Sequence, residues 1–480
     1  MTFCSLRSPL LAGLLAVGSF AHAAEKPNIV FILADDLGSG DLSCYNKDSK
    51  IPTPHLDSLA AEGMRFTDAH SNSSVCTPTR YGVVTGRYAW RSRLKRGVLN
   101  GYSPALIEEG RETVASLLKK QGYNTACIGK WHLGMNFAKD GKKWDHTKPI
   151  TRGPNTLGFD YFLGICASLD MPPYTLIENN RVASQPTEKI AASSYPKYWR
   201  GGAIAKDFSH EDYLPLVGKQ AVKFITSQSA DKPFFLYLPL PAPHKPVVPT
   251  AEFRGKTKAN DYGDFVHEMD WVIGQVVSSL KNKGFFKNTL LIVTSDNASF
   301  AIPERYGVVQ TGHAPNYIYK GQKTDAYEGG HRVPYIVTWP GKVAAGVISK
   351  QVVCTTDLMA TAADVSGTTL GKDAGEDSYS IVPVLLGKQG EKSLREATIH
   401  HSASGMFAIR KGKWKLIVGR GSGGRTKVDK SDKNKIQLFD MINDVRETKN
   451  VHKAHPEIVQ ELTTLLEKYK SSGRSTPSVK

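Results

Sequence analysis

Cysteine is scarce in this chain, which excludes one class of small exported proteins. Only six of the 480 residues are cysteine, too few for a disulfide-dense scaffold in which cross-links replace a hydrophobic core. The length predicts one large domain with a smaller one, or two to three domains in all. With 40% hydrophobic and 22% charged residues, the composition is that of an ordinary globular protein and not of a multi-spanning membrane protein.

Long apolar runs are also missing, except for one at the start of the chain. This run covers residues 10–20, follows Arg7 and precedes Ala21-His22-Ala23. A basic start, a short apolar core and an A-x-A ending are typical of a cleaved secretory signal, and the run is short for a membrane span. We therefore expect a signal peptide over residues 1–23, no stable membrane span, and an exported product that is periplasmic or secreted. A retained signal anchor is the alternative.

Acidic residues are in deficit. The chain has 45 Asp plus Glu against 62 Lys plus Arg, a formal charge of +17. Such a charge attracts polyanions, among them nucleic acid, anionic lipid and sulfated polysaccharide. The basic residues are scattered, without the combination of basic and aromatic residues that marks nucleic-acid modules. We expect no nucleic-acid partner, and a solvated surface for most of these charges.

Apolar segments alternate with amphipathic helices from Pro27 onward. Buried strands are expected at residues 29–34, 125–128, 233–238 and 290–294. Apolar residues between Phe265 and Leu280 fall at helical spacing. Strands separated by helices indicate right-handed crossovers. The predicted fold class is therefore α/β, with a large, mostly parallel sheet sandwiched by helices.

The pattern changes beyond about Leu386. Residues 407–409 and 414–417 flank a Lys411-Gly412 turn, which predicts a hairpin, and residues 436–439 predict a further strand. Pro456 then opens an amphipathic helix. The sequence thus predicts a large domain over residues 24–386 and a C-terminal α+β subdomain over residues 387–480, with an antiparallel sheet and a helix.

Polar clusters follow each of the four expected strands of the large sheet. In order they are Asp35-Asp36, then Lys130 with His132, then His244, then Asp296-Asn297. Ligands of open parallel sheets bind beyond the carboxyl ends of the strands. Three carboxylates and an amide oxygen suit a hard cation, Ca²⁺ or else Mg²⁺, and Ca²⁺ is favoured because it tolerates irregular geometry. Zinc prefers nitrogen and sulfur ligands. Taken singly, each cluster is also explained by a helix cap or a turn.

The most specific motif is Cys76-Thr77-Pro78-Thr79-Arg80. A cysteine of an exported chain is ordinarily buried or disulfide-bonded. Pro78 and Arg80, however, make this segment resemble the C-x-P-x-R signature of type I, formylglycine-dependent sulfatases of the alkaline phosphatase superfamily. The remaining motifs stand in that family's order: Asp35-Asp36, Gly129-Lys130-Trp131-His132, His244, Asp296-Asn297, and Lys323 ahead of Glu328-Gly329-Gly330.

The resemblance implies an alkaline phosphatase-like fold and a modified residue. In that family the cysteine is oxidised during export to Cα-formylglycine, whose hydrated form attacks the sulfur of a sulfate ester. The resemblance therefore implies that this chain is a sulfuric ester hydrolase that releases inorganic sulfate. It also implies a maturation partner, either a formylglycine-generating enzyme or an anaerobic sulfatase-maturating enzyme.

The roles of single residues are likewise carried by the resemblance. It implies that the cation is bound by Asp35, Asp36, Asp296, Asn297 and the formylglycine at Cys76. Arg80 would hold the hydrate, Lys130 and Lys323 would bind sulfate oxygens, and cations placed so stabilise the negative charge of the transition state. His132 would bond a hydroxyl of the hydrate, and Asp296 would be the base for its attack. His244, with Lys323, would protonate the leaving alcohol.

Three loop segments, residues 168–174, 312–316 and 399–402, resemble the carbohydrate sulfatase and arylsulfatase branch. Candidate sugar contacts are Asp170, His313, His331 and His401, although loop capping or a satisfied histidine explains each equally well. The implied substrate is a sulfated carbohydrate of a host or marine polysaccharide, such as a glycosaminoglycan. We favour a sulfated galactose or N-acetylgalactosamine.

Two other functions stay open at the level of the sequence. One is phosphomonoester or phosphonate hydrolysis, which the same superfamily also performs. The other is non-catalytic binding of sulfated glycans by a protein whose Cys76 is unmodified. A monomer and a weak dimer both fit the sequence.

Overall fold

The structure is a computed structural model that describes residues 1–2, 26–195, 197–300, 307–427 and 433–477. The apolar run on which the signal-peptide prediction depends lies outside the described residues. Within them, no helix has both the length and the apolar character needed to cross a membrane. None of the five cysteines in the described part of the chain is in a disulfide.

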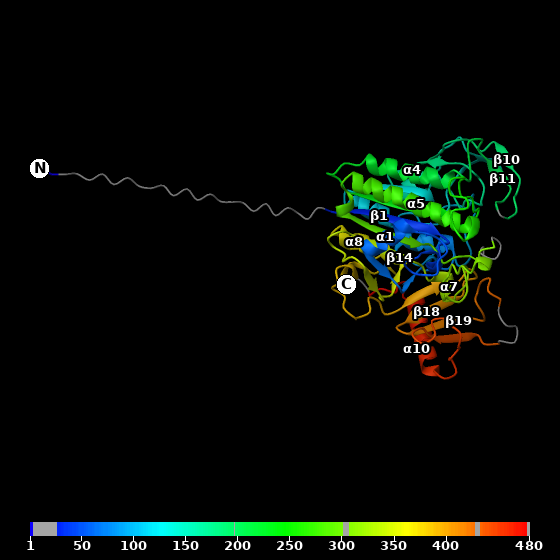
Figure 1. Ribbon diagram of the computed structural model, residues 1–480, viewed down its shortest axis with the longest axis vertical. Coiled ribbons are helices and arrows are strands. Elements are labelled where there is room, and N and C mark those ends of the chain that lie inside the picture. The colour runs from blue at the N-terminus through cyan, green and yellow to red at the C-terminus, as the bar shows by residue number, and fades with distance from the viewer. Residues whose placement is uncertain (3–25, 196, 301–306, 428–432, 478–480) are drawn as a thin grey trace.

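A ten-stranded sheet forms the centre of the larger part of the molecule, in the order β15-β2-β14-β13-β1-β12-β4-β7-β8-β9 (Figure 1). Its five central strands are parallel: β13 (Thr289–Ser295), β1 (Asn28–Asp35), β12 (Phe234–Pro243), β4 (Asn124–Lys130) and β7 (Tyr161–Ile165). The outer strands are β2 (Met64–Phe66), β8 (Ile177–Glu178), β9 (Arg181–Val182), β14 (Tyr335–Thr338) and β15 (Val347–Ser349). β14, β8 and β9 pair antiparallel to their neighbours. The α/β prediction is confirmed, with a mixed sheet whose parallel part is central.

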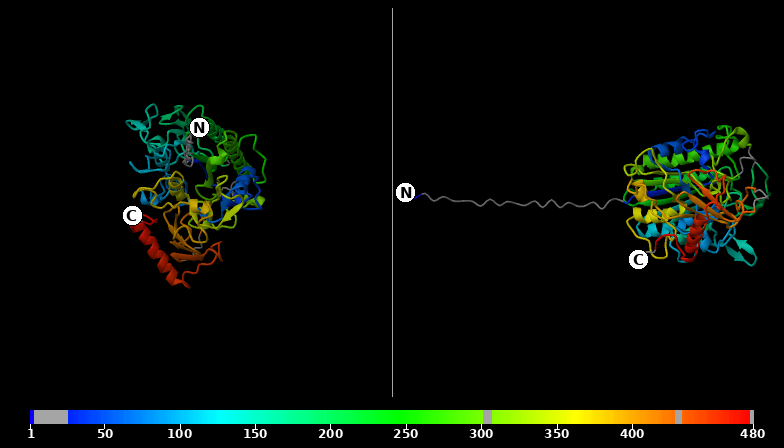
Figure 2. Two further views of the ribbon diagram at one scale, coloured as in Figure 1. Left: turned by 90° about the vertical axis from the view of Figure 1, so that its left-hand side faces the viewer. Right: turned by 90° about the horizontal axis from the view of Figure 1, so that it is seen from below.

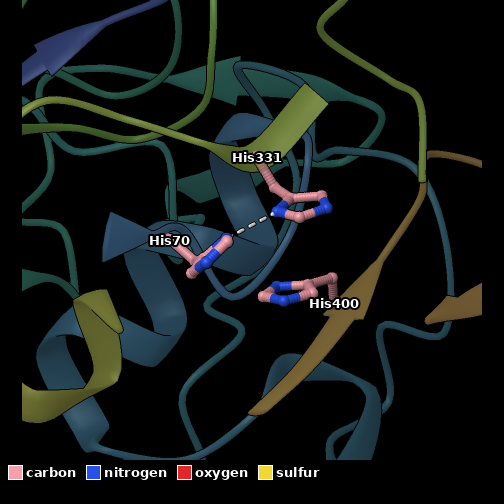
Figure 3. A group of neighbouring side chains, drawn as sticks. All are labelled: His70, His331 and His400. Atoms are coloured by element: carbon pink, nitrogen blue, oxygen red, sulfur yellow. Dashed lines mark hydrogen bonds between the residues drawn. The ribbon is translucent and has the colours of Figure 1, made fainter. Parts of the chain in front are cut away.

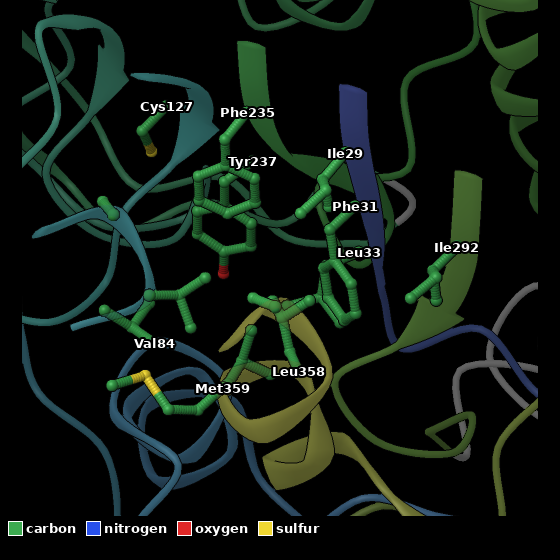
Figure 4. Packing of buried hydrophobic residues seen from close by; sticks show 14 of the residues in the cluster. Ile29, Phe31, Leu33, Val84, Cys127, Phe235, Tyr237, Ile292, Leu358 and Met359 are labelled. Carbon is green, nitrogen blue, oxygen red and sulfur yellow. The ribbon is translucent and has the colours of Figure 1, made fainter. Parts of the chain in front are cut away.

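The continuous apolar sequence of β1 follows from the layers on both faces of the sheet. Ile29, Phe31 and Leu33 join one buried cluster, and Val30 and Ile32 join another. Figure 4 shows the first set pointing together toward Leu358 and Met359 of α8 (Leu358–Val365). Successive side chains of a strand point to opposite faces, so a strand covered on both faces is apolar throughout.

Helices cover the two faces separately. The helices α4 (Tyr213–Thr226) and α5 (Asn260–Asn282) lie on one side in Figure 1, and α8 lies on the other. The other α-helices among the described residues of the larger part are α1 (Pro54–Glu62), α2 (Cys76–Thr85), α3 (Val114–Lys120), α7 (Glu328–His331) and α9 (Val382–Leu385). Residues of α1, α4 and α5 share a cluster with Val30, while residues of α2, α3 and α8 share one with Ile29.

A second sheet follows in the C-terminal part of the chain. Its four antiparallel strands are β17 (Thr398–His401), β18 (Phe407–Lys411), β19 (Trp414–Val418) and β20 (Ile436–Asp440). The helix α10 (Pro456–Ser471) packs on β18 and β19, and Leu462 and Leu466 are buried against them. Figure 2 shows this part beside the main body. The predicted hairpin and the helix that begins at Pro456 are both present.

Three two-stranded ribbons contain the remaining described strands. They pair β10 (Glu188–Ile190) with β11 (Gly202–Ile204), β16 (Val353–Cys354) with β3 (Ala69–His70), and β5 (Ala138–Asp140) with β6 (Lys143–Asp145). The β10–β11 ribbon lies in the segment that joins β9 to α4. The β3 strand leads into the chain segment before Cys76.

Candidate active site

Acidic residues from two neighbouring strands meet at the carboxyl end of the sheet. β1 and β13 run parallel, with Ala34 opposite Ser295, so the residues that follow them are brought together. The backbone N–H of Asp36 donates to Asp296 Oδ1 at 3.2 Å, and Asn297 Nδ2 donates to Asp36 Oδ1 at 2.7 Å. Asp36 adopts a left-handed backbone (φ 68°), a conformation that aspartate tolerates better than most residues. Four of the five predicted cation ligands, Asp35, Asp36, Asp296 and Asn297, therefore form one buried group.

Three cations are paired with these carboxylates. Lys130, at the end of β4, lies 2.5 Å from Asp35 Oδ2. Lys323 Nζ lies 2.6 Å from Asp36 Oδ1. Arg80 donates through both Nε and Nη2 to Oδ2 of Asp296, at 3.0 and 2.7 Å. Each of the three carboxylates predicted at this site is thus paired with a basic residue that was also predicted there.

The helix α2 places Cys76 above this group. Cys76 is the first residue of α2 and Arg80 lies four residues later, so both side chains lie on one face of the helix. The Sγ atom of Cys76 lies 3.6 Å from Asp35 Oδ1 and 3.3 Å from Lys323 Nζ. The Sγ atom marks the position that the oxygens of the predicted formylglycine side chain would occupy.

Burial dominates the titration of the site. Burial raises the pKa of Asp35 to about 7 against the opposing effect of Lys130. Burial opposes ionisation of Asp296 as well, but Arg80, Lys130 and Lys323 lower its pKa to about 2. Burial raises the pKa of the Cys76 thiol to about 12 despite the nearby lysines. An unmodified Cys76 would therefore be a poor nucleophile, because the reactive form is the thiolate. Asp296, held by Arg80, is a weak base in this arrangement.

Two histidines face the same space. The side chain of His244 lies beyond the end of β12, with Nε2 3.8 Å from Asp36 Oδ2 and Nδ1 2.5 Å from the Lys245 carbonyl oxygen. His132 Nε2 lies 2.8 Å from the carbonyl oxygen of Leu99, and its buried Nδ1 has no hydrogen-bond partner among the described residues. If Nε2 donates to that carbonyl, Nδ1 is left as an acceptor. Burial, followed by the nearby lysines, lowers the pKa of His244 well below its usual value.

The donor set fits a hard divalent cation. Oδ2 of Asp36 and Oδ1 of Asn297 are buried and have no hydrogen-bond partner among the described residues. Buried oxygens without partners are costly unless something binds them. The atoms that gather here are mainly carboxylate and amide oxygens, which calcium and magnesium prefer. The geometry therefore suits the predicted cation, and no particular ion is singled out by it.

A cavity of about 220 Å³ opens above Cys76. Its floor includes Cys76, His132, His244 and Lys323. Asp170 also lines it, and both carboxylate oxygens of this buried side chain have no hydrogen-bond partner in the described part of the protein. Of the four predicted sugar contacts, Asp170 is the one whose side chain is placed to accept hydrogen bonds from a bound molecule.

The other three predicted sugar contacts lie outside this cavity. His313 is buried, with Nε2 2.9 Å from Asp41 Oδ1. His401, on β17, is buried against the ring of Phe407, and its backbone oxygen accepts a hydrogen bond from Ser74 N. None of the three histidines lines this cavity, so their contact with a substrate stays a prediction. Loop resemblance could place the segments near the site but could not give the direction of each side chain.

His331 belongs to a buried histidine cluster, shown in Figure 3. Its Nδ1 lies 3.0 Å from Nδ1 of His70, and its ring stacks on that of His400 with centroids 3.8 Å apart and planes at 7°. The lone pair of an imidazole nitrogen lies in the ring plane, so two parallel stacked rings do not point at a common metal ion. Lys415 donates to Nε2 of His331 at 2.9 Å. The cluster is therefore a structural contact between β17 of the C-terminal sheet and the segments of the larger part that carry His70 and His331.

Sequence reasoning missed several residues of the cavity. Arg200, Lys245, Phe300 and Arg425 all line it. Lys245 follows a predicted residue directly, and that adjacency was the one available signal. Arg200 and Arg425 lie in loops far apart in the sequence, and only the folded chain brings them to Cys76.

Comparison with known proteins gives consistent matches over most of the chain. A family model described as sulfatase matches residues 27–368, and a model described as the C-terminal region of N-sulphoglucosamine sulphohydrolase matches residues 322–472. An N-acetylgalactosamine-6-O-sulfatase of Bacteroides thetaiotaomicron is 35% identical over 93% of this chain and 94% of its own. The N-acetylgalactosamine-6-sulfatase of Mus musculus is 31% identical over 86% of this chain and 76% of its own.

A solved structure agrees with the sequence matches. It comes from work on the metabolism of multiple glycosaminoglycans by Bacteroides thetaiotaomicron, and it has a TM-score of 0.81 and 34% identity. The match covers 93% of this chain and 100% of the other.

Proposed function

This chain belongs to the sulfatase family and is a sulfuric ester hydrolase, and we propose that it removes sulfate from a terminal N-acetylgalactosamine or galactose through a formylglycine at Cys76. The observation that supports this best is the position of Cys76 at the floor of the cavity. Its Sγ lies 3.3 Å from Lys323 and 3.6 Å from Asp35, and His244 lines the same cavity.

Formylglycine would supply the nucleophile that the thiol does not. The hydrate of an aldehyde carries two hydroxyls, one to attack sulfur and one to expel sulfate afterwards. A maturation enzyme has to make this residue, either a formylglycine-generating enzyme or an anaerobic counterpart. The raised pKa of the buried Cys76 thiol, about 12, supports this requirement, since little thiolate would exist near neutral pH.

The lysines would hold the sulfate group. Lys130 and Lys323 both approach the carboxylates below Cys76, at 2.5 and 2.6 Å, so their charges are fixed before the substrate arrives. Fixed cations stabilise developing negative charge without the cost of reorganising solvent. Arg80, whose Nε and Nη2 donate to Asp296, would hold the hydrate of the formylglycine.

His244 would protonate the leaving alcohol. Sugar alcohols are poor leaving groups, so a general acid lowers the barrier. The pKa of His244 is lowered by burial and then by Lys323 and Lys130. A bound sulfate ester brings a negative charge to these lysines, and this charge raises the pKa of His244 toward the range in which it carries a proton.

A divalent cation would be held by Asp35, Asp36, Asp296 and Asn297. Calcium is the proposed ion, with magnesium as the alternative. When bound, it would supply positive charge opposite the sulfate oxygens and the modified Cys76.

The proposed substrate rests on the relatives and on the size of the cavity. Relatives named as N-acetylgalactosamine-6-sulfatases match most of this chain. The cavity, about 220 Å³, is below the ~300–1,000 Å³ of ordinary ligand pockets. Such a space favours one sugar ring at a chain end, and hence removal of sulfate from glycan termini during polysaccharide degradation.

Three further predictions accompany this function. They are export from the cytosol to the periplasm or medium, a boundary between the two parts of the chain at residues 386 and 387, and a monomer or weak dimer.

The decisive experiment is mass spectrometry of the tryptic peptide that ends at Arg80. The protein is made together with a formylglycine-generating enzyme, and the expected product carries an aldehyde in place of the Cys76 thiol. Release of inorganic sulfate from N-acetylgalactosamine 6-sulfate is then measured on the same sample. A thiol that persists in the native host, or aldehyde-bearing protein that releases no sulfate from any sulfated sugar, would contradict the proposal.

A further inference from the structure

The charged residues around Cys76 fall into an inner and an outer group. The inner group balances, because Asp35, Asp36 and Asp296 face Arg80, Lys130 and Lys323. The outer group lies on loops that line the cavity, and its positive and negative charges do not balance. It consists of one carboxylate, Asp170, and three cations, Arg200, Lys245 and Arg425.

Arg200 is fixed against Asp170 by the backbone. Its N–H donates to the carbonyl oxygen of Asp170 at 3.1 Å. The hydroxyl of Tyr174 bridges the carbonyl oxygens of both residues, at 2.9 and 2.7 Å. The side chains form only a long ion pair, with Arg200 Nε 3.6 Å from Asp170 Oδ2, and Arg200 Nη1 donates to Asn100 Oδ1 at 3.3 Å. This guanidinium is held at the cavity and keeps donors for another acceptor.

Lys245 and Arg425 are held in position mainly by aromatic rings, and only Lys245 has a carboxylate nearby, at a long ion-pair distance. Lys245 Nζ lies 3.7 Å from the centre of the Tyr198 ring and 3.8 Å from Asp170 Oδ2. Arg425 lies over the ring of Phe300 at 4.9 Å, and its backbone N–H donates to Asp325 Oδ1 at 2.8 Å. Arg425 has no ion pair with any residue that the structure describes. Burial, opposed by Asp170 and reinforced by Lys323 and Arg200, lowers the pKa of Lys245.

We propose that Arg200, Lys245 and Arg425 form a subsite for a second anionic group of the substrate, next to the sulfate that is removed. This inference rests on the proposed function, since the first sulfate defines the place of the second group. Two sources have the required chemistry: a second sulfate on the same sugar ring, and the carboxylate of a neighbouring uronic acid. In either case Asp170 would accept hydrogen bonds from sugar hydroxyls between the two anions.

A neutral sugar beside the scissile sulfate would leave these three cations with the single carboxylate of Asp170, at 3.6 Å from Arg200 and 3.8 Å from Lys245. Sugar hydroxyls could be bound by neutral side chains, and three cations close together repel one another. General attraction of polyanions by a basic surface is the simpler explanation, since the whole chain has a charge of +17. That explanation predicts that singly and doubly anionic sugars differ only through general charge attraction. It also predicts that replacing a basic residue of the cavity weakens binding no more than replacing one on the surface.

The test compares binding of three sugars to the full chain with Cys76→Ala, measured by calorimetry in the presence of Ca²⁺. The sugars are N-acetylgalactosamine 6-sulfate, N-acetylgalactosamine 4,6-disulfate, and a disaccharide in which a uronic acid is linked glycosidically to N-acetylgalactosamine 6-sulfate. We expect one of the doubly anionic sugars to bind about tenfold or more tightly than N-acetylgalactosamine 6-sulfate, because hydrogen bonds between charged groups add this much to affinity. The sugar that gains affinity identifies the source of the second anion.

Variants localise the effect. In Arg200→Gln the dissociation constant of the singly anionic sugar divided by that of the tighter doubly anionic sugar should fall toward 1. Arg425→Gln, a change at an exposed position, should reduce the same ratio without risk to folding. Arg181→Gln is the matched control, because Arg181 is exposed on β9 and loses the same charge. Equal affinity for all three sugars, or an equal loss in Arg200→Gln and Arg181→Gln, would overturn the subsite. Failure of the proposed function is separate, because it appears as absence of sulfate release from aldehyde-bearing wild-type protein.

Discussion

At the scale of single residues, the site depends on a few side chains that each have more than one partner. Lys323 contacts both Asp36 and Cys76, at 2.6 and 3.3 Å, and is itself 8% exposed. His244 lies between the cavity and Asp36. Because these contacts are shared, loss of activity in a variant does not by itself identify the role of the replaced residue. The role is identified by comparing the loss on different substrates.

Replacing the proposed general acid should affect substrates according to their leaving groups. In His244→Ala, kcat for a sugar sulfate should fall about 10²–10⁴-fold, the usual contribution of a general acid. For an aryl sulfate whose phenol leaves without a proton, the loss should be much smaller. Steady-state sulfate release from both substrates measures the difference. Equal losses on both would show that His244 positions the sulfate and does not supply a proton.

Removing one proposed cation ligand should abolish stabilisation by calcium. Asp36 Oδ2 is buried without a hydrogen-bond partner in the described residues, so a bound cation would satisfy it. Adding Ca²⁺ should raise the Tm of the wild type, because a ligand that binds only the folded state stabilises it. In Asp36→Asn this rise should vanish, while Asp48→Asn, a change at an exposed acid, should keep it. Differential scanning fluorimetry measures both, and a rise that persists in Asp36→Asn would place the cation elsewhere.

At the scale of elements, two strands that approach closely position Lys130 at the end of β4 and His132 just beyond it. Gly129 in β4 lies opposite Gly164 in β7. A Cβ atom on Gly164 would lie 1.8 Å from the carbonyl oxygen of Gly129, so β7 can be this close only without a side chain. The close approach fixes the direction in which β4 ends, and therefore the position of Lys130.

Gly164→Ala should therefore destabilise the protein. The clash is with backbone, which cannot rotate away, and we expect a loss of about 3 kcal/mol in the free energy of unfolding, at the upper end for overpacking. Gly371→Ala is the control, because a Cβ there meets nothing within 4 Å. Urea unfolding of both variants provides the measurement. Equal stability of the two would show that β4 and β7 can separate at no cost.

At the scale of the whole molecule, a buried polar network joins the C-terminal sheet to the larger part. Lys415 of β19 lies 2.9 Å from Glu328 Oε1 and 2.8 Å from Glu447 Oε1. Arg410 of β18 pairs with Asp68 at 2.9 Å. His400 of β17 stacks on His331, and Ser73 and Ser74, just before Cys76, donate to the His401 carbonyl. The second sheet thus holds the segment that leads to the nucleophile.

This network should make the protein sensitive to acid. Burial lowers the pKa of His70, His331 and His400, and that of His401 to about 4. A histidine whose folded pKa is lowered binds fewer protons in the folded state. Stability is therefore complete above the unfolded pKa of about 6.5 and is lost as pH falls below it, by up to about 1.4 kcal/mol per pH unit for each histidine. Urea unfolding at pH 7 and pH 5 should show this loss.

The variant His400→Gln should reduce the dependence on pH, because one buried titrating group is gone. The control is His455→Gln, at a histidine whose side chain is only partly buried, and this variant should keep the wild-type slope. A wild type equally stable at both pH values would show that these histidines accept protons without unfolding.

The central strands and the chemistry at their ends could be predicted from local sequence. A run such as residues 29–34 is apolar throughout only if both faces are covered, and a polar residue directly after such a strand must lie at the sheet's edge. For the same reason, the sequence alone is enough to predict that Asp35, Lys130, His244 and Asp296 meet. The Cys76 pentapeptide added the family and its chemistry.

The cavity walls and the histidine cluster depend on contacts between distant segments, and only the tertiary structure decided them. His331 and His401 were predicted as sugar contacts, yet both side chains are buried away from the cavity. Arg200 and Arg425 carry no local pattern, yet loops 225 residues apart bring them to one cavity. Hydrophobic periodicity and sequence motifs indicate the strand or helix to which a residue belongs. The direction of a loop side chain is set by its neighbours in space, and those are fixed only when the chain has folded.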